Sequence, residues 1–294
     1  MKTLTLRLKG GIGNQLFSYA FARRLSIINN AKLHIDIKTG FEKDFIYKRN
    51  YQLYNFNIKD VTIVKPIYTF FILKKIFLKL LNYFYPGSFY MILNDNSLNY
   101  NPNLLNYTFK HKLYIEGYFQ SEDYFKDIEC IIRDDLTILP PSDDFNNQLL
   151  NNISKCSNSV CLHIRNFEKT SYKNIVNISI DYYSNAINYL NSRYQNLHFF
   201  IFSDDINNIT KYLELLNNNY TIISHNNSDN NAYIDLWLMK ECKYFITANS
   251  TFSWWAAWLC INKNKIILTP DYKGDGINNF WNFDGLIPNS WIKI

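Results

Sequence analysis

The sequence predicts an α/β protein made of two Rossmann-like halves, and two patterns support this prediction. In the second half, short apolar strands alternate with longer helices, which is typical of a parallel sheet covered on both faces. In the first half, a strand at Leu4–Leu8 leads through the glycines of Gly10–Gly13 into a helix and a second strand at Lys32–Asp36. Such a βαβ opening is typical of a Rossmann-like unit.

Length and charge limit the class of protein. With 294 residues, of which 47% are hydrophobic and 19% charged, the chain has the composition of a soluble protein with room for two domains. We place the domains at 1–145 and 146–294, because the polar stretch after Leu139 predicts a linker. The formal charge of +6 suits an anionic ligand, but no Lys/Arg block resembles a nucleic-acid patch. We therefore expect no nucleic-acid partner.

The five cysteines predict reduced thiols rather than disulfides or a zinc site. No CxxC pair and no histidine at zinc spacing accompanies Cys130, Cys156, Cys161, Cys242 or Cys260. The first residues predict a strand and not the apolar core of a signal peptide. We therefore expect a cytoplasmic protein.

The least decisive stretch is 63–93, where Lys74, Lys75 and Lys79 interrupt apolar and aromatic residues. No apolar run reaches the ~18 residues that a membrane-spanning helix needs. We favour a core helix whose lysines face water. The alternative is a basic helix on an anionic membrane surface, which would make the protein peripheral on the inner face of the membrane.

The remaining elements continue the alternation. A strand at Lys112–Phe119 precedes a helix that begins after Ser121, a favoured N-cap residue, and ends at about Leu136. In the second half we expect strands at Val160–Arg165, His198–Ser203, Tyr220–Ser224, Lys243–Thr247 and Lys265–Pro270, and helices at Asp181–Tyr194, Ile206–Leu216, Ala232–Cys242 and from Ser253 onwards. The tail, 271–294, is long enough to pack back on the first domain.

Three of these strands end in unusual polar residues. Their ends read His163-Ile164-Arg165, Ser203-Asp204-Asp205 and Asn249-Ser250-Thr251, with Ser253 in the next helical turn. Ligands of parallel sheets bind at the carboxyl ends of strands, and a guanidinium opposite a helix N-terminus suits a diphosphate. The alternative is structural: Arg165 pairs with Asp204 or Asp205, His163 is a core residue, and the hydroxyls only cap the helix. The three ends together favour a nucleotide site.

Five stretches, in order along the chain, match the motifs of one known family. They are GGIGNQLFSYAFARRL at Gly10–Leu25, EGYFQSEDYF at Glu116–Phe125, HIR at His163–Arg165, FSDD at Phe202–Asp205 and NSTFSWWAAWL at Asn249–Leu259. In these stretches the chain resembles bacterial members of glycosyltransferase family 11, the α-1,2-fucosyltransferases. The resemblance implies a GT-B-type fold, with a cleft between an acceptor-side N-terminal domain and a nucleotide-sugar-binding C-terminal domain.

The resemblance also implies an activity, the inverting transfer of L-fucose from GDP-fucose to the 2-hydroxyl of a galactoside without a metal or other cofactor. The adjacent Asp204 and Asp205 do not form an Asp-x-Asp pair, and no His/carboxylate cluster predicts a divalent ion. The acceptor would be a galactoside-terminated oligosaccharide or a lipid-linked glycan of O-antigen synthesis.

Two other functions stay open. One is a transferase for another nucleotide sugar, and the other is a catalytically weakened homologue that binds a nucleotide or carbohydrate. A nicotinamide-dependent oxidoreductase is disfavoured, because the first turn lacks G-x-G-x-x-G.

The family pattern assigns roles to individual residues. Arg165 and the first turn of the last helix would neutralise the departing diphosphate, while Gly11, Gly13 and Asn14 would reach across the cleft toward the donor. The expected donor-binding set is Gly11, Gly13, Asn14, Arg165, Ser203, Asp204, Asp205, Asn249, Ser250, Thr251 and Ser253, and the expected catalytic set is Arg165, His163 and Glu168.

One departure from the family pattern concerns the phosphate site. The family motif is His-x-Arg-Arg-x-Asp or Asn, whereas this chain has Asn166 in place of the second Arg and ends in Glu168. A missing charged donor to phosphate costs ~1.5–3 kcal/mol, which would weaken activity or change the donor preference unless another cation compensates. The general base stays open among Glu168, His34 and Asp36, which we place near strand ends that face the cleft, and the leaving phosphate itself. Glu168 is preferred because it lies beside the diphosphate motif, and its alternative role is to orient Arg165 or a loop.

Overall fold

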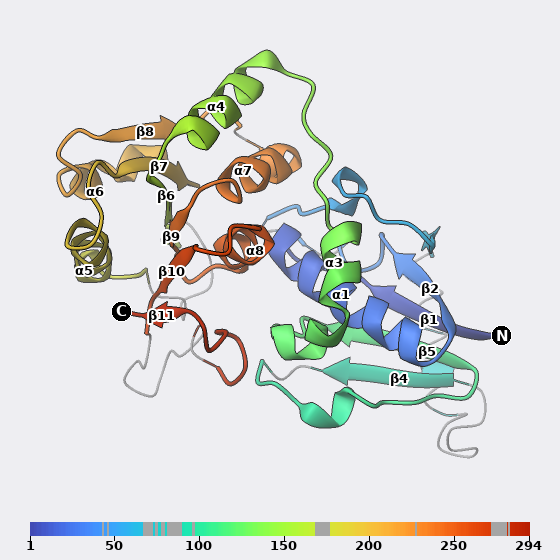
Figure 1. Cartoon of the computed structure of the whole chain (residues 1–294). Coiled ribbons are helices and arrows are strands. Elements are labelled where there is room, and N and C mark those ends of the chain that lie inside the picture. Colours follow the sequence, from blue (N-terminus) through green and yellow to red (C-terminus); the bar gives the residue numbers. More distant parts are fainter. Residues whose placement is uncertain are drawn as a thin grey trace. The chain divides into compact units, whose positions relative to one another are not determined.

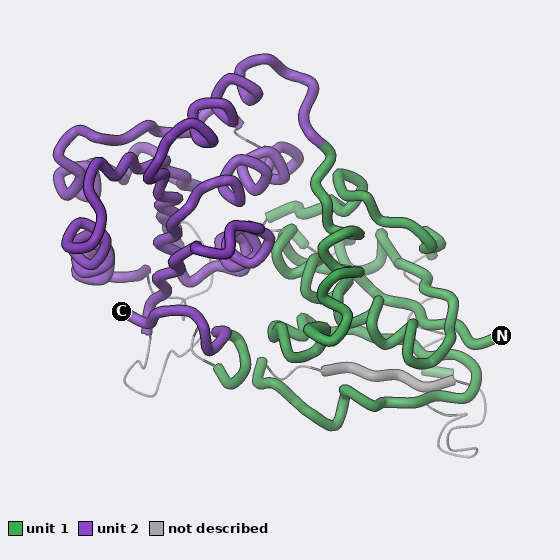
Figure 2. The backbone as a smooth tube through the Cα atoms, in the orientation of Figure 1, with its two compact units in different colours: residues 1–139, 283–286 green, residues 140–282, 287–294 purple. Residues whose placement is uncertain are grey.

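The structure is a computed structural model that describes residues 1–42, 44, 45, 47–66, 73, 76, 77, 80, 90–95, 98–167, 177–226, 228–271, 281 and 283–294. The chain forms two compact units, which Figure 2 shows in different colours. Unit 1 consists of residues 1–139 and 283–286, and unit 2 of residues 140–282 and 287–294. Each unit is built on a parallel sheet (Figure 1). The α/β fold class predicted from the sequence is confirmed.

Unit 1 has a five-stranded sheet in the order β3-β2-β1-β5-β4. Its strands are β1 (Lys2–Arg7), β2 (Ala31–Asp36), β3 (Val61–Val64), β4 (Tyr90–Asp95) and β5 (Lys112–Gly117). Its helices are α1 (Ile12–Ile28) and α3 (Glu129–Asp135), with short 3-10 helices η1 (Leu53–Asn55), η2 (Pro102–Leu104), η3 (Glu122–Tyr124) and η4 (Lys126–Ile128). Strand β1 pairs with β2 on one side and with β5 on the other, so the order of strands reverses at β1.

Helix α1 begins where glycine allows a sharp turn. Gly10 has a φ of +77°, which L side chains rarely adopt, and a Cβ there would lie 3.0 Å from the Asn14 Nδ2 atom. The helix that follows is buried on most sides, and Leu16, Phe17 and Ala20 are fully inaccessible to solvent. This packing fixes the start of α1 near the carboxyl end of β1.

Unit 2 has a six-stranded sheet in the order β11-β10-β9-β6-β7-β8. Its strands are β6 (Ser159–Ile164), β7 (His198–Ser203), β8 (Tyr220–Ile223), β9 (Tyr244–Ile246), β10 (Ile266–Thr269) and β11 (Ile292–Lys293). Its helices are α4 (Asp144–Lys155), α5 (Ile180–Asn191), α6 (Thr210–Leu213), α7 (Ala232–Met239) and α8 (Thr251–Leu259), with η5 (Ile206–Asn208) and η6 (Asp229–Asn231).

The predicted helix Ile206–Leu216 is divided into η5 and α6. The Asn208 backbone amide donates to the Asp205 carbonyl at 3.2 Å, and the Asn208 side chain donates to the Asp205 carboxylate at 2.7 Å. These bonds hold the first turn as a separate element, since side-chain bonds to the local backbone compete with helix formation.

Helix α8 is anchored by tryptophans. Trp254 and Trp255 are fully buried, with ring centroids 5.1 Å apart. Trp254 also lies 5.4 Å from Trp291, which immediately precedes β11. Helix α8 is apolar on every face because every face is packed against the protein interior. This packing also fixes the position of its N-terminus.

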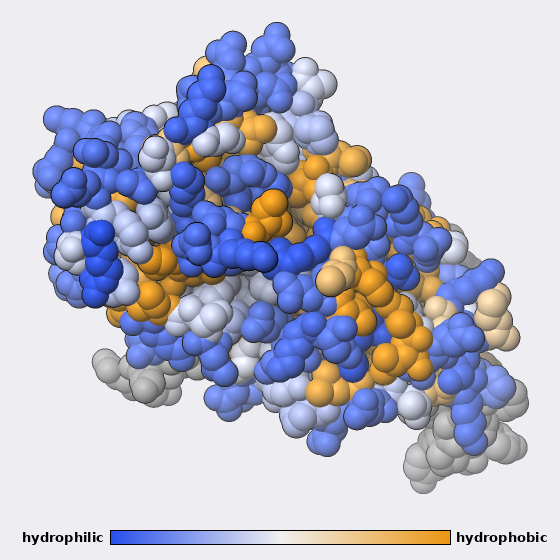
Figure 3. All heavy atoms as spheres, in the orientation of Figure 1, coloured by the Kyte–Doolittle hydropathy of each residue, from blue (hydrophilic) through white to orange (hydrophobic). Residues whose placement is uncertain are grey.

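Part of the surface of unit 1 is apolar. Ile27, Ile28 and Ile131 are 38%, 42% and 40% exposed, and Figure 3 shows apolar side chains gathered over α1 and α3.

Most of the stretch 63–93 lies outside the described residues. Within it, Leu73, Ile76, Phe77 and Leu80 are 53–64% exposed. This exposure contradicts the core-helix interpretation at these four positions, because a core helix would bury its apolar side chains. Among the described residues, no helix is both long and apolar enough to cross a bilayer. Contact with a membrane surface stays a prediction.

The packing of α8 predicts a large effect of Trp254→Ala. Truncating this fully buried ring should lower the free energy of unfolding of unit 2 by about 3–5 kcal/mol. Urea unfolding followed by circular dichroism measures the change, and Ile261→Ala, at an 85% exposed position, should shift it by less than about 0.5 kcal/mol. Equal stability of the two variants would show that the tryptophans do not anchor α8.

Candidate active site

The topology of unit 2 selects one edge of its sheet as a ligand site. Strand β6 pairs in parallel with β9, but the chain leaves β6 toward β7 and leaves β9 toward β10, on opposite sides. The two connections therefore diverge at the carboxyl ends of β6 and β9. Ligands of open α/β sheets bind in the crevice at such a switch point.

Two of the predicted strand ends lie on either side of this switch point. Leu162 pairs with Ile246, and Arg165 and Asn249 each follow three residues later. The His163 ring contacts the Phe252 ring of the first turn of α8, with centroids 5.7 Å apart. The end of β6 and the N-terminus of α8 are therefore neighbours, as the diphosphate hypothesis requires.

In this structure Arg165 forms an ion pair with Asp204, at the end of β7. Its Nη1 atom lies 2.9 Å from Asp204 Oδ2, and its guanidinium lies 5.2 Å from the centroid of the Phe167 ring. The side chains of Arg165 and Asp204 are 21% and 30% exposed. The ion pair proposed as a structural alternative is thus present, but a pair this accessible contributes little, about 0–1 kcal/mol, and is readily exchanged for a stronger anion.

Asn166, the residue that departs from the family motif, joins the β6 and β7 ends. Its backbone amide donates to Asp204 Oδ1 at 3.0 Å, and its side-chain amide donates to Asp205 Oδ2 at 3.1 Å. It also accepts a hydrogen bond from Asn177 Nδ2 at 2.9 Å. Asp205 is 5% exposed, and its backbone amide donates to Ser203 Oγ at 3.1 Å. Asp205 and Ser203 therefore order the loop, whereas Asp204 is the more accessible carboxylate.

His163 is buried but not satisfied. The residue is 4% exposed, and among the described residues its Nδ1 atom has no hydrogen-bond partner. Burial, together with the nearby Arg165 charge, lowers the pKa of the imidazole to about 3. His163 is therefore neutral near pH 7. Its Nδ1 atom, which no described residue pairs, lies beside Arg165, and the core-residue alternative does not explain this.

The first turn of α8 is held by its own hydroxyls. The Ser250 amide donates to the Ala248 carbonyl at 2.8 Å, and Ser250 Oγ accepts from the Phe252 amide at 3.3 Å. Ser253 is 1% exposed, and its Oγ accepts from the Ala248 amide at 3.2 Å. Ser253 and the Ser250 amide therefore shape the turn, while the partly exposed Asn249 and Thr251 lie at its accessible side.

The predicted glycine-turn residues lie in unit 1. Gly11 is the N-cap residue of α1, Gly13 is buried in its first turn, and Asn14 Oδ1 accepts from Gln120 Nε2 at 2.7 Å. The geometry gives them a place at the carboxyl end of β1.

The candidates for the general base differ in their surroundings. Glu168 lies outside the described residues. Asp36 is fully buried and accepts from the Lys38 and Thr39 amides and from the Tyr114 hydroxyl, so its prediction as a general base that can reach an acceptor is wrong. The pKa of His34 is lowered by burial and by Lys32 and Lys112, which lie toward the amino ends of β2 and β5 and not at the carboxyl edge.

Sequence reasoning assigned no role to Arg7, Lys9 and Glu116, which form ion pairs at the carboxyl ends of β1 and β5. The sequence feature that could have indicated them is a charged residue near the end of each of the two apolar strands, Arg7 in β1 and Glu116 in β5. Among the described residues, no group of three or more His, Cys, Asp or Glu side chains could hold a metal ion.

The chain is similar to known glycosyltransferases over its whole length. A family model described as Glycosyl transferase family 11 matches residues 3–279. An alpha-1,2-colitosyltransferase of Escherichia coli is 31% identical over 306 residues, covering 100% of this chain and 99% of the relative. The O-antigen biosynthesis glycosyltransferase WbnK of Escherichia coli is 28% identical over 330 residues, covering 98% of this chain and 99% of the relative.

The fold is similar to that of fucosyltransferase NodZ from Bradyrhizobium. The TM-score is 0.54 at 14% identity, with 88% of this chain and 93% of NodZ covered. A further structure of NodZ, described as an alpha-1,6-fucosyltransferase, was co-crystallised with GDP. At this identity the likeness concerns the fold, and it confirms the GT-B-type class that the motifs implied.

The lowered pKa of His163 predicts a pH dependence of stability. The unfolded chain binds a proton at this imidazole below its ordinary pKa of 6.5, whereas the folded chain binds one only near pH 3, so stability falls as the pH falls between these values. From about pH 6.5 to about pH 4.5 the wild type should lose about 1 kcal/mol per pH unit more than His163→Gln. Urea unfolding of both proteins across this range measures the difference, and parallel curves would contradict the assignment.

Proposed function

Because the chain belongs to glycosyl transferase family 11, we propose that it transfers a 6-deoxy sugar from a GDP-linked donor to a galactoside during O-antigen synthesis. Membership of the family makes it a glycosyltransferase, and the donor and acceptor are the proposed part. The first candidate reaction is inverting transfer of L-fucose from GDP-fucose to the 2-hydroxyl of the galactoside, without a metal cofactor.

One observation carries the proposal: Arg165 and the N-terminus of α8 lie together at the switch point of the unit 2 sheet. A guanidinium and the positive end of a helix dipole are complementary to a diphosphate. The description of NodZ as co-crystallised with GDP supports a guanosine diphosphate group in a protein of this fold. The two Escherichia coli relatives support a role in O-antigen assembly.

The negative charge that develops in the reaction lies on the diphosphate, next to Arg165 and the N-terminus of α8. The acceptor hydroxyl oxygen forms a bond to C1 of the sugar, the bond from C1 to the diphosphate oxygen breaks, and its electron pair leaves with GDP, on which negative charge develops. The proton of the acceptor hydroxyl passes to a general base or to the departing diphosphate. Arg165 would leave Asp204 for the diphosphate, and the α8 dipole would stabilise the same charge. The buried Nδ1 of His163 would find its partner in the bound donor.

The donor sugar can be tested by comparing fucose with colitose. Colitose is fucose without its 3-hydroxyl, and a site built to hydrogen-bond a hydroxyl rejects the analogue lacking it by about 10⁴-fold or more. Turnover of GDP-fucose and GDP-colitose on the same galactoside, with linkage analysis of the product, therefore tests the donor. A preference for GDP-colitose would identify GDP-colitose, and not GDP-fucose, as the donor.

A second candidate, a catalytically weakened binding protein, is favoured by Asn166 alone. In this structure Asn166 supplies neutral hydrogen bonds where the family pattern has a second guanidinium. Calorimetry that detects GDP binding, combined with no transfer from either GDP-sugar to any galactoside, would favour this candidate.

A lipid-linked acceptor would bring the protein to the inner membrane face. The exposed Leu73, Ile76, Phe77 and Leu80 support that part of the proposal. Flotation with liposomes, with and without anionic lipid, tests it.

Replacing Arg165 should damage the reaction and not the fold. Arg165→Ala should lower kcat by about 10²–10³-fold, because the diphosphate loses a preorganised charged donor, while Tm changes little at this accessible site. The matched control is Arg193→Ala, which removes an exposed guanidinium stacked on Tyr189 in the same unit. Activity of Arg165→Ala within a few-fold of the wild type would exclude Arg165 as the diphosphate ligand.

A further inference from the structure

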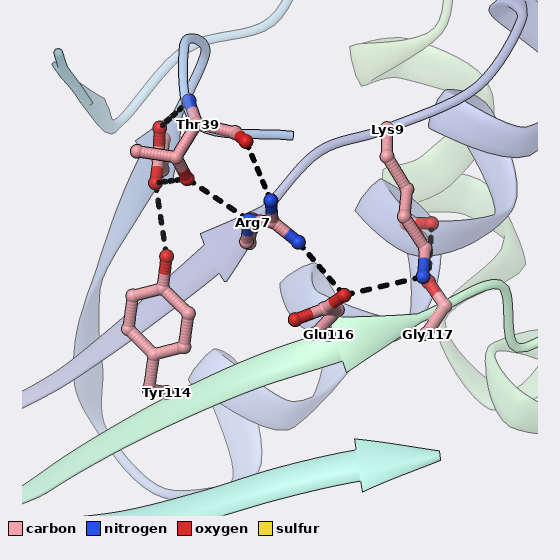
Figure 4. A network of polar contacts seen from close by, with 8 residues as sticks. Arg7, Lys9, Thr39, Tyr114, Glu116 and Gly117 are labelled. Carbon is pink, nitrogen blue, oxygen red and sulfur yellow. Dashed lines mark hydrogen bonds and ion pairs between the residues drawn. The ribbon is translucent and has the colours of Figure 1, made fainter. Parts of the chain in front are cut away.

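The sheet of unit 1 carries a charged cluster at its own switch point, between β1 and β5. Arg7 ends β1, Lys9 follows it, and Glu116 lies one residue before the end of β5. Arg7 Nη1 lies 2.8 Å and Lys9 Nζ 3.3 Å from Glu116 Oε1 (Figure 4). The side chains are 13%, 25% and 11% exposed, respectively. One carboxylate thus bridges two cations at the strand ends where a parallel sheet binds ligands.

A second layer of residues holds Arg7 in place. Arg7 Nε donates to Thr39 Oγ1 at 2.9 Å, and the Thr39 amide donates to the buried Asp36 carboxylate at 3.0 Å. Tyr114 donates to the same carboxylate at 2.9 Å (Figure 4). The loop reaches Arg7 because of Gly40, where a Cβ would lie 1.7 Å from the Leu8 carbonyl oxygen. The Arg7 guanidinium therefore has a fixed orientation.

Stability does not explain why charges occupy these positions. The preceding residues of both strands that face the core, such as Leu6 and Ile115, are fully buried and apolar. The desolvation free energy of two largely buried charges is about as large as their electrostatic attraction. Apolar residues at these positions would therefore stabilise the fold equally well. A largely buried ion pair at a switch point is better explained by a ligand.

The chemistry of the cluster indicates a neutral polyol. Among the described residues of the cluster, the two cations and the carboxylates of Glu116 and Asp36 balance in charge, which disfavours a phosphate or a carboxylate ligand. Lys9 Nζ lies 5.0 Å from the centroid of the Tyr118 ring, which adds an aromatic surface. A carboxylate that accepts from one hydroxyl, an ammonium that donates to another and an aromatic side chain suit a sugar ring.

We propose that this cluster in unit 1 binds the terminal sugar of the acceptor glycan, with Glu116 and Lys9 hydrogen-bonded to its hydroxyls and Arg7 as a positioning residue for Glu116. The proposal rests on the proposed function for the identity of the sugar, a galactoside. Glu116 has the role of holding the acceptor, because its Oε1 atom is already bonded to both cations and is a charged hydrogen-bond acceptor.

The test separates acceptor binding from donor binding in the full-length protein. Glu116→Gln and Lys9→Met should each raise KM for the galactoside by about tenfold to a hundredfold, since each removes a charged hydrogen bond. KM for the GDP-sugar, Kd for GDP and kcat should stay within about twofold, because the diphosphate site lies in unit 2.

The matched control is the Arg23–Asp135 ion pair of unit 1, whose side chains are 17% and 6% exposed with a separation of 2.9 Å. Arg23→Gln should lower Tm as much as Glu116→Gln without changing KM for the galactoside. If Glu116→Gln does not fold, Lys9→Met decides, because Lys9 is the more exposed partner.

Two results overturn the inference: an unchanged acceptor KM in the variants, or an equal rise of the acceptor and donor KM values. If the wild type binds GDP but transfers neither sugar, the proposed function fails and the inference is decided by binding alone. Saturation-transfer NMR with methyl β-galactoside should then show a signal that Glu116→Gln abolishes, and a signal of the same size in both proteins would reject the site.

Discussion

The parallel pairing of β6 with β9 is the constraint on which the account of this protein depends. Because the chain leaves these two neighbouring strands in opposite directions, the sheet of unit 2 has a crevice at their carboxyl ends. Arg165 and the first turn of α8 are the groups that this pairing brings together. Unit 1 repeats the arrangement between β1 and β5, and there too charged residues lie at the strand ends. The same topology thus produces two sites of different chemistry: an accessible cation with a helix dipole, and a charge-balanced cluster.

Rigid support distinguishes the site in unit 2 from an ordinary capped helix. The buried tryptophans fix α8 along its length, and the Ser250 and Ser253 hydroxyls fix its first turn. Beside these fixed groups, the buried Nδ1 atom of His163 has no hydrogen-bond partner among the described residues, and Arg165 is paired with the accessible Asp204. Preorganised groups of this kind stabilise a developing charge without rearranging at the moment of reaction.

The fold, and the meeting of the β6 end with the start of α8, could be predicted from the sequence because both follow from local patterns. Alternating apolar runs specify parallel strands, and polar residues at the ends of those runs specify what meets at the carboxyl edge. Apolar content alone did not predict burial, as the exposed Leu73 shows. Asp36 was wrongly taken as a general-base candidate because four donors from the following loop and from β5 enclose its carboxylate, which no strand pattern reveals. Arg7 and Glu116 were missed for a related reason, since their pairing joins residues 109 positions apart.

A crystal structure with GDP would show whether Arg165 and α8 bind the diphosphate. Arg165 should turn from Asp204 to the diphosphate, with phosphate oxygens about 2.7–3.2 Å from its guanidinium and from donors of the first turn of α8. The base and ribose should lie at the carboxyl edge of the unit 2 sheet. GDP bound elsewhere, or bound at this edge with Arg165 still paired to Asp204 and no phosphate near α8, would contradict this role of Arg165 and α8.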